Sequence, residues 1–167
     1  SEEGLNKLGA SMSDSIEIVG WGQATSSLYC DSDPTSLPTT ALAAKRAYDS
    51  AGLSAEDVEV AEVHDCFTLT EILMMEALGF ADAGKGGDML VRGDTDIEGN
   101  LPVNTGGGLV GFGHPVGATG VKQVVEIWRQ MKGRCGGYQM PKMPSVGITA
   151  NMGGDDKTAV VGLYRNL

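Results

Sequence analysis

The two histidines of the chain, His64 and His114, both lie in short motifs whose residue types suit acyl and proton transfer. His64 begins the motif HDCF (64–67), directly after an apolar run, and His114 lies in the motif GHP (113–115) at the end of a glycine-rich loop. Histidine titrates near neutral pH, and cysteine is the most nucleophilic common side chain. We therefore expect His64, Cys66 and His114 to form one site.

The elements around the HDCF motif would place it at an edge where active sites concentrate. The alternating segment 58–63 predicts a strand, and the apolar spacing of 67–80 predicts a helix. Cys66 would then precede a helix N-terminus, where free N–H groups favour the thiolate, at the carboxyl end of a strand. The alternative is that Asp65 merely caps the helix, Cys66 is buried and His64 is a surface turn residue.

The rest of the chain predicts an α/β fold. Residues 1–15 are interpreted as a linker or a cut N-terminal end, 81–100 as a polar excursion and Leu101–Asn104 as a short extended segment. Further strands are expected at 16–23, 145–150 and 158–164, and further helices at 39–50 and 116–132. The crossover helices predict parallel neighbouring strands, and the last two strands predict a hairpin.

Composition excludes several classes of function. The 167 residues carry a formal charge of −10, which argues against nucleic acid or a membrane surface as a partner. No apolar run approaches the ~20 residues that a membrane-spanning helix needs. Three widely spaced cysteines, Cys30, Cys66 and Cys135, match neither a disulfide framework nor a zinc site and suggest a reducing compartment. Asp155-Asp156 is interpreted as a solvated turn, so we expect no metal site.

The loop before His114 is rich in glycine. Residues 106–111 formally match GxGxxG, but the expected helix does not follow directly, so a dinucleotide site is disfavoured. We interpret this segment as a loop whose backbone approaches a ligand, with His114 held beyond it; a tight loop with an incidental histidine is the alternative. In the helix that follows, we expect a buried apolar stripe of Val121, Val124, Val125 and Trp128.

Two segments resemble the C-terminal half of a thiolase. VHDCFTLTEILMMEALGF (Val63–Phe80) and GGGLVGFGHPVGATGVKQ (Gly106–Gln123) carry the likeness, with GHP followed by GATG as its strongest part. HDCF, where ordinary thiolases have an Asn-Glu motif, points to the subgroup related to sterol carrier protein X, the SCP2-thiolases. The resemblance implies a thiolase C-terminal domain over residues 16–167, with a mixed five-stranded sheet flanked by helices.

The resemblance also implies roles for the site residues. Ordinary thiolases carry a Cys-x-Gly motif where this chain has Asn151-Met152-Gly153, so Cys66 would replace that second thiol in moving the proton at the α-carbon. His114 would activate the nucleophile and bind the first thioester oxygen, and His64 would stabilise the oxyanion. Four residues would support the site through loop geometry: Asn104, Gly113, Asn151 and Gly153.

The thiolase pattern places the acyl-accepting cysteine in an N-terminal domain, which we expect to be absent here. The resemblance thus implies the C-terminal catalytic half of an acetyl- or propanoyl-CoA C-acyltransferase, inactive as this chain alone. It would carry out thiolytic cleavage or Claisen condensation of 3-ketoacyl-CoA in lipid metabolism. Acyl-CoA and coenzyme A would be substrates, with no permanently bound cofactor, and an N-terminal half or partner subunit would complete an oligomeric enzyme.

Two other functions are compatible with the resemblance. One is a thiolase-like aldol lyase of steroid or fatty side chains, which would lack the acyl-accepting cysteine; the other is a non-catalytic thiolase-like subunit. Retention of His64, Cys66 and His114 argues against the non-catalytic subunit. We expect an intracellular protein, cytoplasmic in a prokaryote and peroxisomal or mitochondrial in a eukaryote.

Overall fold

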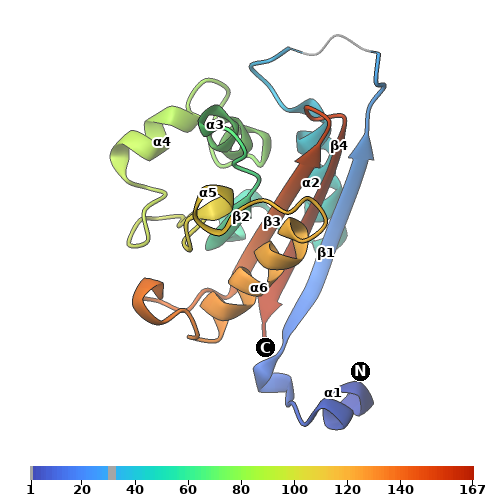
Figure 1. Cartoon of the computed structure of the whole chain (residues 1–167), viewed down its shortest axis with the longest axis vertical. Coiled ribbons are helices and arrows are strands. Elements are labelled where there is room, and N and C mark those ends of the chain that lie inside the picture. The colour runs from blue at the N-terminus through green and yellow to red at the C-terminus, as the bar shows by residue number, and fades with distance from the viewer. Residues whose placement is uncertain (1, 30–32) are drawn as a thin grey trace.

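The computed structural model describes residues 2–29 and 33–167 and shows a mixed sheet with helices on both faces (Figure 1). The strands are β1 (Ile16–Thr25), β2 (Val60–Val63), β3 (Val146–Gly153) and β4 (Thr158–Asn166), in the order β1-β4-β3-β2. β2 and β3 are parallel, whereas β4 is antiparallel to both β3 and β1. The predicted α/β class and the β3–β4 hairpin are therefore confirmed.

The sheet in the described residues has four strands, so the expectation of five is wrong. Leu101–Asn104 runs beside β2 but forms only an isolated bridge between Ala61 and Val103. Pro102 lacks an N–H group, and Asn104 has a φ of 49°, so a regular ladder cannot extend along this segment. The expectation that β1 and β2 are neighbours is also wrong, because β1 pairs with β4 at the opposite edge.

Helix α2 (Pro38–Ala51) covers one face of the sheet, together with α3 (Thr68–Ala77). Its buried face is made of alanines and threonines, and it lies so close to β1 that a Cβ on Gly22 would be 2.1 Å from the carbonyl oxygen of Ala43. Asp156 accepts hydrogen bonds from the backbone N–H groups of Thr39 and Thr40 at the start of α2. Asp156 is 5% exposed, so the expectation of a solvated Asp155-Asp156 turn is wrong for this residue.

The remaining helices are α1 (Glu2–Leu8), α4 (Gly86–Arg92), α5 (Gly108–Phe112) and α6 (Thr119–Met131), with 3-10 turns at Met12–Asp14, Ala55–Asp57 and Gly136–Tyr138. α1 and α4 lie in segments that were expected to be irregular. Gly86 begins α4 where the helix crosses α3, since a Cβ there would lie 2.4 Å from the Ile72 carbonyl oxygen. No helix in 2–29 or 33–167 is long and apolar enough to cross a membrane.

Helix α6 covers the other face of the sheet and agrees with the expected buried stripe only in part. The side chains that it buries include Gln123, Glu126 and Gln130, with Ile127 and Met131. Val121 and Val125 point outward and are 67% and 37% exposed. Of the expected stripe, Val124 packs against the core and Trp128 is half-buried, whereas Val121 and Val125 form an apolar strip on the surface.

Candidate active site

A cavity of about 480 Å³ opens at the carboxyl ends of the neighbouring parallel strands β2 and β3. It is lined by His64, Cys66, Phe67, Thr70, His114, Val116, Asn151, Met152, Gly153, Gly154 and Asp155. The structure thus brings together five of the seven residues named from the sequence. The other two, Asn104 and Gly113, are not among the lining residues.

The two imidazole rings are in contact. Their centroids are 4.9 Å apart, and the planes meet at 84°, an edge-to-face arrangement. His64 is 6% exposed, whereas His114 lies on an exposed loop. Burial lowers the pKa of His64, and the neighbouring His114 lowers it too; its bond to Asn151 and the carboxylate of Asp65 oppose these effects. The net lowering keeps His64 neutral at physiological pH.

A chain of amide groups fixes the tautomer of His64. Gln123 donates through Nε2 to the carbonyl of Ala150, so its Oε1 accepts from Asn151 Nδ2 at 3.1 Å. Asn151 Oδ1 therefore faces His64 Nδ1, 2.7 Å away, and Nδ1 must carry the proton. Neutral His64 consequently has its lone pair on Nε2.

His114 is oriented in a similar way by a hydroxyl group. Thr119 Oγ1 donates to the carbonyl of Pro115 at 3.3 Å, which leaves the oxygen to accept from His114 Nδ1 at 2.6 Å. No hydrogen bond to Nε2 of either His64 or His114 is found within the described residues. Both imidazoles can therefore accept a proton or hold a substrate group at Nε2.

Cys66 is half-buried and lies just ahead of the first residue of α3. Its Sγ is 3.9 Å from Thr70 Oγ1, a weak contact within the first turn of the helix. The residue thus lies ahead of the N-terminus of α3, with Phe67 between it and the first residue of the helix. Of the other cysteines, Cys135 is buried outside the cavity, and Cys30 lies outside the described residues.

Asp65 fastens the HDCF segment to the glycine-rich loop. Its Oδ1 accepts a hydrogen bond from the backbone N–H of Leu109 at 2.8 Å. Gly108 has a φ of +57°, and a Cβ on it would lie 2.1 Å from Asp65 Oδ2, so a side chain at this position would clash. Asp65 therefore caps α5 rather than α3, and the two motifs are held as one unit.

Asn104 and Gly113 lie just behind the cavity. Asn104 Oδ1 accepts from the N–H of Val63 at 2.8 Å, and Asn104 N–H donates to Ala61, which fixes the end of β2 before His64. Gly113 is the residue at which α5 ends and the chain turns to His114.

Sequence reasoning missed Gln123 and Thr119, the groups that set the orientation of Asn151 and His114. A signal was present, because Thr119, Gln123, Glu126 and Gln130 recur at helical spacing and predict one polar face. That polar face is buried, and each of its groups makes at least one hydrogen bond.

Comparison with known proteins identifies the family. Residues 20–166 match the family described as Thiolase C-terminal domain-like. The chain belongs to this family. An acetyl-CoA acetyltransferase of Methanothermobacter thermautotrophicus is 41% identical over 149 residues, covering 89% of this chain and 39% of that protein. The thiolase C-terminal domain described here thus spans less than half of that relative.

A further relative supports the SCP2-thiolase likeness, and a solved structure shares the fold. Sterol carrier protein 2 of Oryctolagus cuniculus is 43% identical over 123 residues, covering 74% of this thiolase-like chain and 22% of that protein. Among solved structures, the Ltp2-ChsH2(DUF35) aldolase has a TM-score of 0.76 at 24% identity, covering 90% of this chain and 40% of that one. At this identity the structural likeness concerns the fold alone.

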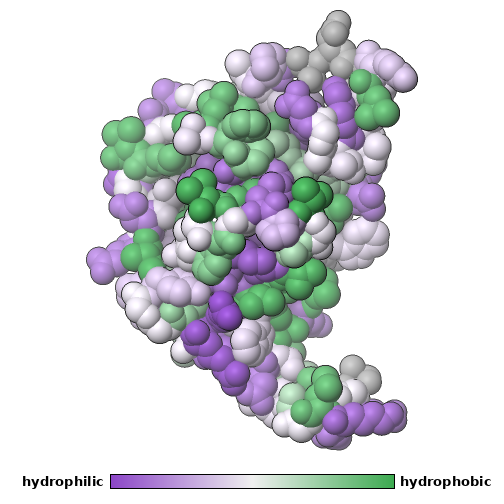
Figure 2. Space-filling view, in the orientation of Figure 1, coloured by the Kyte–Doolittle hydropathy of each residue, from purple (hydrophilic) through white to green (hydrophobic). Residues whose placement is uncertain are grey.

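The thiolase-like domain has an apolar surface next to the cavity. Figure 2 shows hydrophobic residues over α5, the loop that follows it and α6, with hydrophilic residues between them. The most exposed members are Val110, Val116 and Val121, at 85%, 86% and 67%. Apolar patches that border a site are typical of surfaces that contact another protein.

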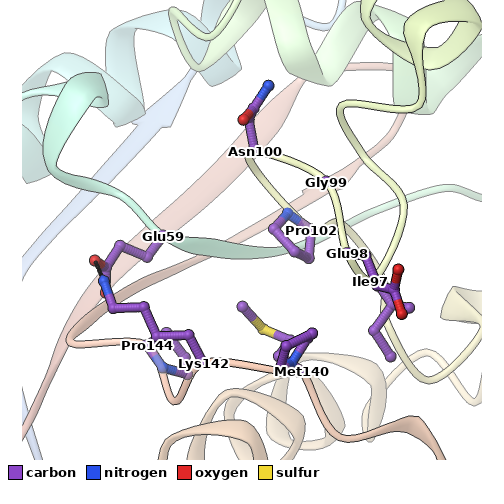
Figure 3. A pocket seen from close by; sticks show the side chains of 10 residues that line it. Glu59, Ile97, Glu98, Gly99, Asn100, Pro102, Met140, Lys142 and Pro144 are labelled. Atoms are coloured by element: carbon purple, nitrogen blue, oxygen red, sulfur yellow. Dashed lines mark hydrogen bonds and ion pairs between the residues drawn. The ribbon is translucent and has the colours of Figure 1, made fainter.

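A second cavity, of about 210 Å³, lies at the opposite end of β2 from His64 (Figure 3). Loops around Ile97–Pro102 and Met140–Pro144 enclose it, and Lys142 donates to Glu59 at 2.7 Å on its wall. No histidine or cysteine is among the described residues that line it. This cavity therefore does not offer the groups for acyl transfer.

Proposed function

We propose that this chain is the proton-transferring half of a thiolase that cleaves 3-ketoacyl-CoA with coenzyme A or runs the reverse Claisen condensation. The observation that carries the proposal is the cavity in which Cys66, His64 and His114 meet, with both Nδ1 atoms occupied and both Nε2 atoms unbonded. A thiol and two imidazole acceptors are the groups that α-proton exchange and acyl transfer need.

In the condensation direction, the Cys66 thiolate removes the α-proton of acetyl-CoA. The resulting carbanion attacks the carbonyl carbon of an acyl group held as a thioester on a cysteine of the N-terminal half. The new carbon–carbon bond forms as the carbon–sulfur bond breaks, and the cysteine leaves as a thiolate. Thiolysis is the reverse sequence, in which Cys66 returns the proton to the departing α-carbon.

The two histidines have different roles in acyl transfer and in stabilising the enolate. His114 accepts the thiol proton of the nucleophilic cysteine at Nε2 and then donates to the first thioester oxygen. His64 stabilises the enolate oxygen, but its Nε2 can donate only after taking up a proton, because Nδ1 already donates to Asn151. Asn104, Gly113, Asn151 and Gly153 hold these groups in place.

The test uses the chain completed by an N-terminal thiolase half that carries the nucleophile. Cys66→Ala should abolish α-hydrogen exchange, followed by NMR, while acyl transfer to the partner cysteine, followed by mass, persists. His114→Ala should slow acyl transfer by ~10²–10³, the usual effect of losing one oxyanion donor. Cys135→Ala is the matched control, since Cys135 does not line the cavity. Full thiolytic activity in Cys66→Ala would refute the proposed role of the thiol.

The N-terminal half is proposed to dock on the strip that Val121 and Val125 expose on α6, the helix that follows the His114 loop. Changing both valines to serine should weaken association in sedimentation experiments and reduce hydrophobic-dye binding by the isolated chain. Val160→Ser is the matched control, because Val160 is 47% exposed on β4. A monomer that neither binds the dye nor associates with the half would contradict this interface.

An aldol lyase is the second candidate. The unbonded Nε2 atoms of His64 and His114 could accept the hydroxyl proton of a 3-hydroxyacyl thioester without any acyl-accepting cysteine. The substrates separate the candidates: cleavage of a 3-hydroxyacyl-CoA to an aldehyde or ketone plus a shorter acyl-CoA supports the lyase. Formation of an acyl-enzyme of the expected mass from 3-ketoacyl-CoA supports the thiolase.

A further inference from the structure

A buried carboxylate lies directly behind the site and has no part in the chemistry proposed above. Glu62 is on β2, two residues before His64, so both side chains leave the same face of the strand. It is 1% exposed, and its Oε2 accepts a hydrogen bond from Lys122 Nζ at 3.0 Å. Its Oε1 has no hydrogen-bond partner among the described residues. A buried oxygen without a partner is costly, so its retention calls for an explanation.

Lys122 connects this carboxylate to the loop that carries His114. Its ammonium group lies 4.2 Å from the centroid of the Phe112 ring, a cation–π contact. Phe112 is the last residue of α5, two residues before His114. The Phe112 side chain is 46% exposed, but one edge of its ring lies close to the loop, since a Cβ on Gly106 would be 2.5 Å from Phe112 Cε2. The lysine therefore bridges β2 and the end of α5.

The charged groups around Glu62 come from each element packed against it. Burial raises the pKa of Glu62 to about 7, Lys122 on α6 opposes the rise, and the carboxylates of Glu126 on α6 and Asp65 after β2 add to it. Glu126 is already engaged by Arg129 and Tyr138, so Lys122 is the cation left to Glu62. The thiol of Cys135 adds no charge beside Glu62, because burial raises its pKa to about 11. The charge on Glu62 is thus balanced by Lys122 alone among these groups.

We propose that Glu62 is a positioning residue for His114: when ionised, it holds Lys122 against Phe112 and thereby fixes the end of α5 from which His114 follows. When Glu62 is protonated, Lys122 is released, because its side chain is 21% exposed and its ammonium gains hydration by moving outward. This inference rests on the proposed function only in giving His114 a role in acyl transfer; the positioning itself is a property of the fold.

The test follows the loop rather than the reaction. Amide hydrogen exchange of 109–114, corrected for its intrinsic pH dependence, and the imidazole ¹⁵N shifts of His114 are measured on the chain between about pH 6 and pH 8. We expect exchange to slow roughly tenfold as Glu62 ionises, with a midpoint near its pKa. Glu62→Gln should remove the inflection, and Lys122→Met should leave exchange fast at every pH. Lys45→Met, which breaks a surface pair with Asp49, is the matched control.

The results separate the possible explanations. An inflection that survives in Glu62→Gln, or its absence in the unmodified chain, overturns the proposal. If Glu62→Gln does not fold, the ¹³C carboxyl shift of Glu62 in the unmodified chain replaces it, and its midpoint must coincide with that of the exchange. These readouts need no substrate. Absence of the inflection in the unmodified chain therefore refutes the positioning role, whereas absence of turnover in the completed enzyme refutes the proposed function.

Discussion

Replacing Glu62 with glutamine is expected to flatten the dependence of the chain's stability on pH. In the fold, burial raises the pKa of this carboxyl from its ordinary value of 4.5 to about 7. Between these two pH values the folded chain binds more protons than the unfolded chain, so the free energy of unfolding falls as pH rises. The stabilisation is fully present below pH 4.5 and is lost once pH passes about 7. The shift corresponds to about 3 kcal/mol between these limits.

Urea unfolding monitored by circular dichroism at a series of pH values measures this slope directly. Between pH 4.5 and about pH 7, the free energy of unfolding of the unmodified chain should fall by about 3 kcal/mol because of Glu62. In Glu62→Gln this part of the decrease should be absent. Glu17→Gln is the control, because the Glu17 side chain is 52% exposed. An unchanged slope in Glu62→Gln would show that Glu62 titrates in the fold as it does in water, and the buried-carboxylate argument would fail.

Three other substitutions or titrations test the local geometry. Gly108→Ala should lower the free energy of unfolding by about 1–3 kcal/mol, because φ is +57° and the new Cβ meets Asp65. A thermal unfolding midpoint equal to that of the unmodified chain would contradict the close contact between Asp65 and Gly108. Asp156→Ala should cost about 1–2 kcal/mol in urea unfolding, since it removes the cap of α2. His64 should titrate below the ordinary 6.5 in NMR, and Asn151→Ala should lower its pKa further; an unshifted midpoint would refute its burial.

The parts of the fold that follow from local pattern could be predicted from the sequence. The alternation of 58–63 and the helical spacing of 67–80 predict β2 and α3, and the structure has them at Val60–Val63 and Thr68–Ala77. α4 could not be predicted, because Gly86-Gly87 is typical of a loop. Its glycine is needed instead for the close crossing over Ile72.

The parts that depend on contacts between distant segments could not be predicted. The sequence places His64, Cys66 and His114 at junctions, and the cavity brings them together. The chain from Gln123 through Asn151 to His64 involves three separate elements, so its hydrogen bonds leave no local pattern. The buried face of α6 could be predicted only in part, because amphipathicity alone does not say which of two faces meets the sheet when both carry apolar residues.

The pairing of β1 with β4 sets an order on how this sheet can assemble. Ile16 pairs with Asn166 and Thr25 with Thr158. Because β1 is the first strand of this sheet to be synthesised and β4 is the last, β1 can pair only after β4 has been made. Closing so long a loop lowers the entropy of the chain before the non-local contacts that offset this loss can form. Folds rich in such pairings therefore form slowly. During synthesis, β1 would remain unpaired with α2 as its main cover until β4 leaves the ribosome. Shortening the chain within β4 would therefore remove the partner of both β1 and β3 and open the sheet from within.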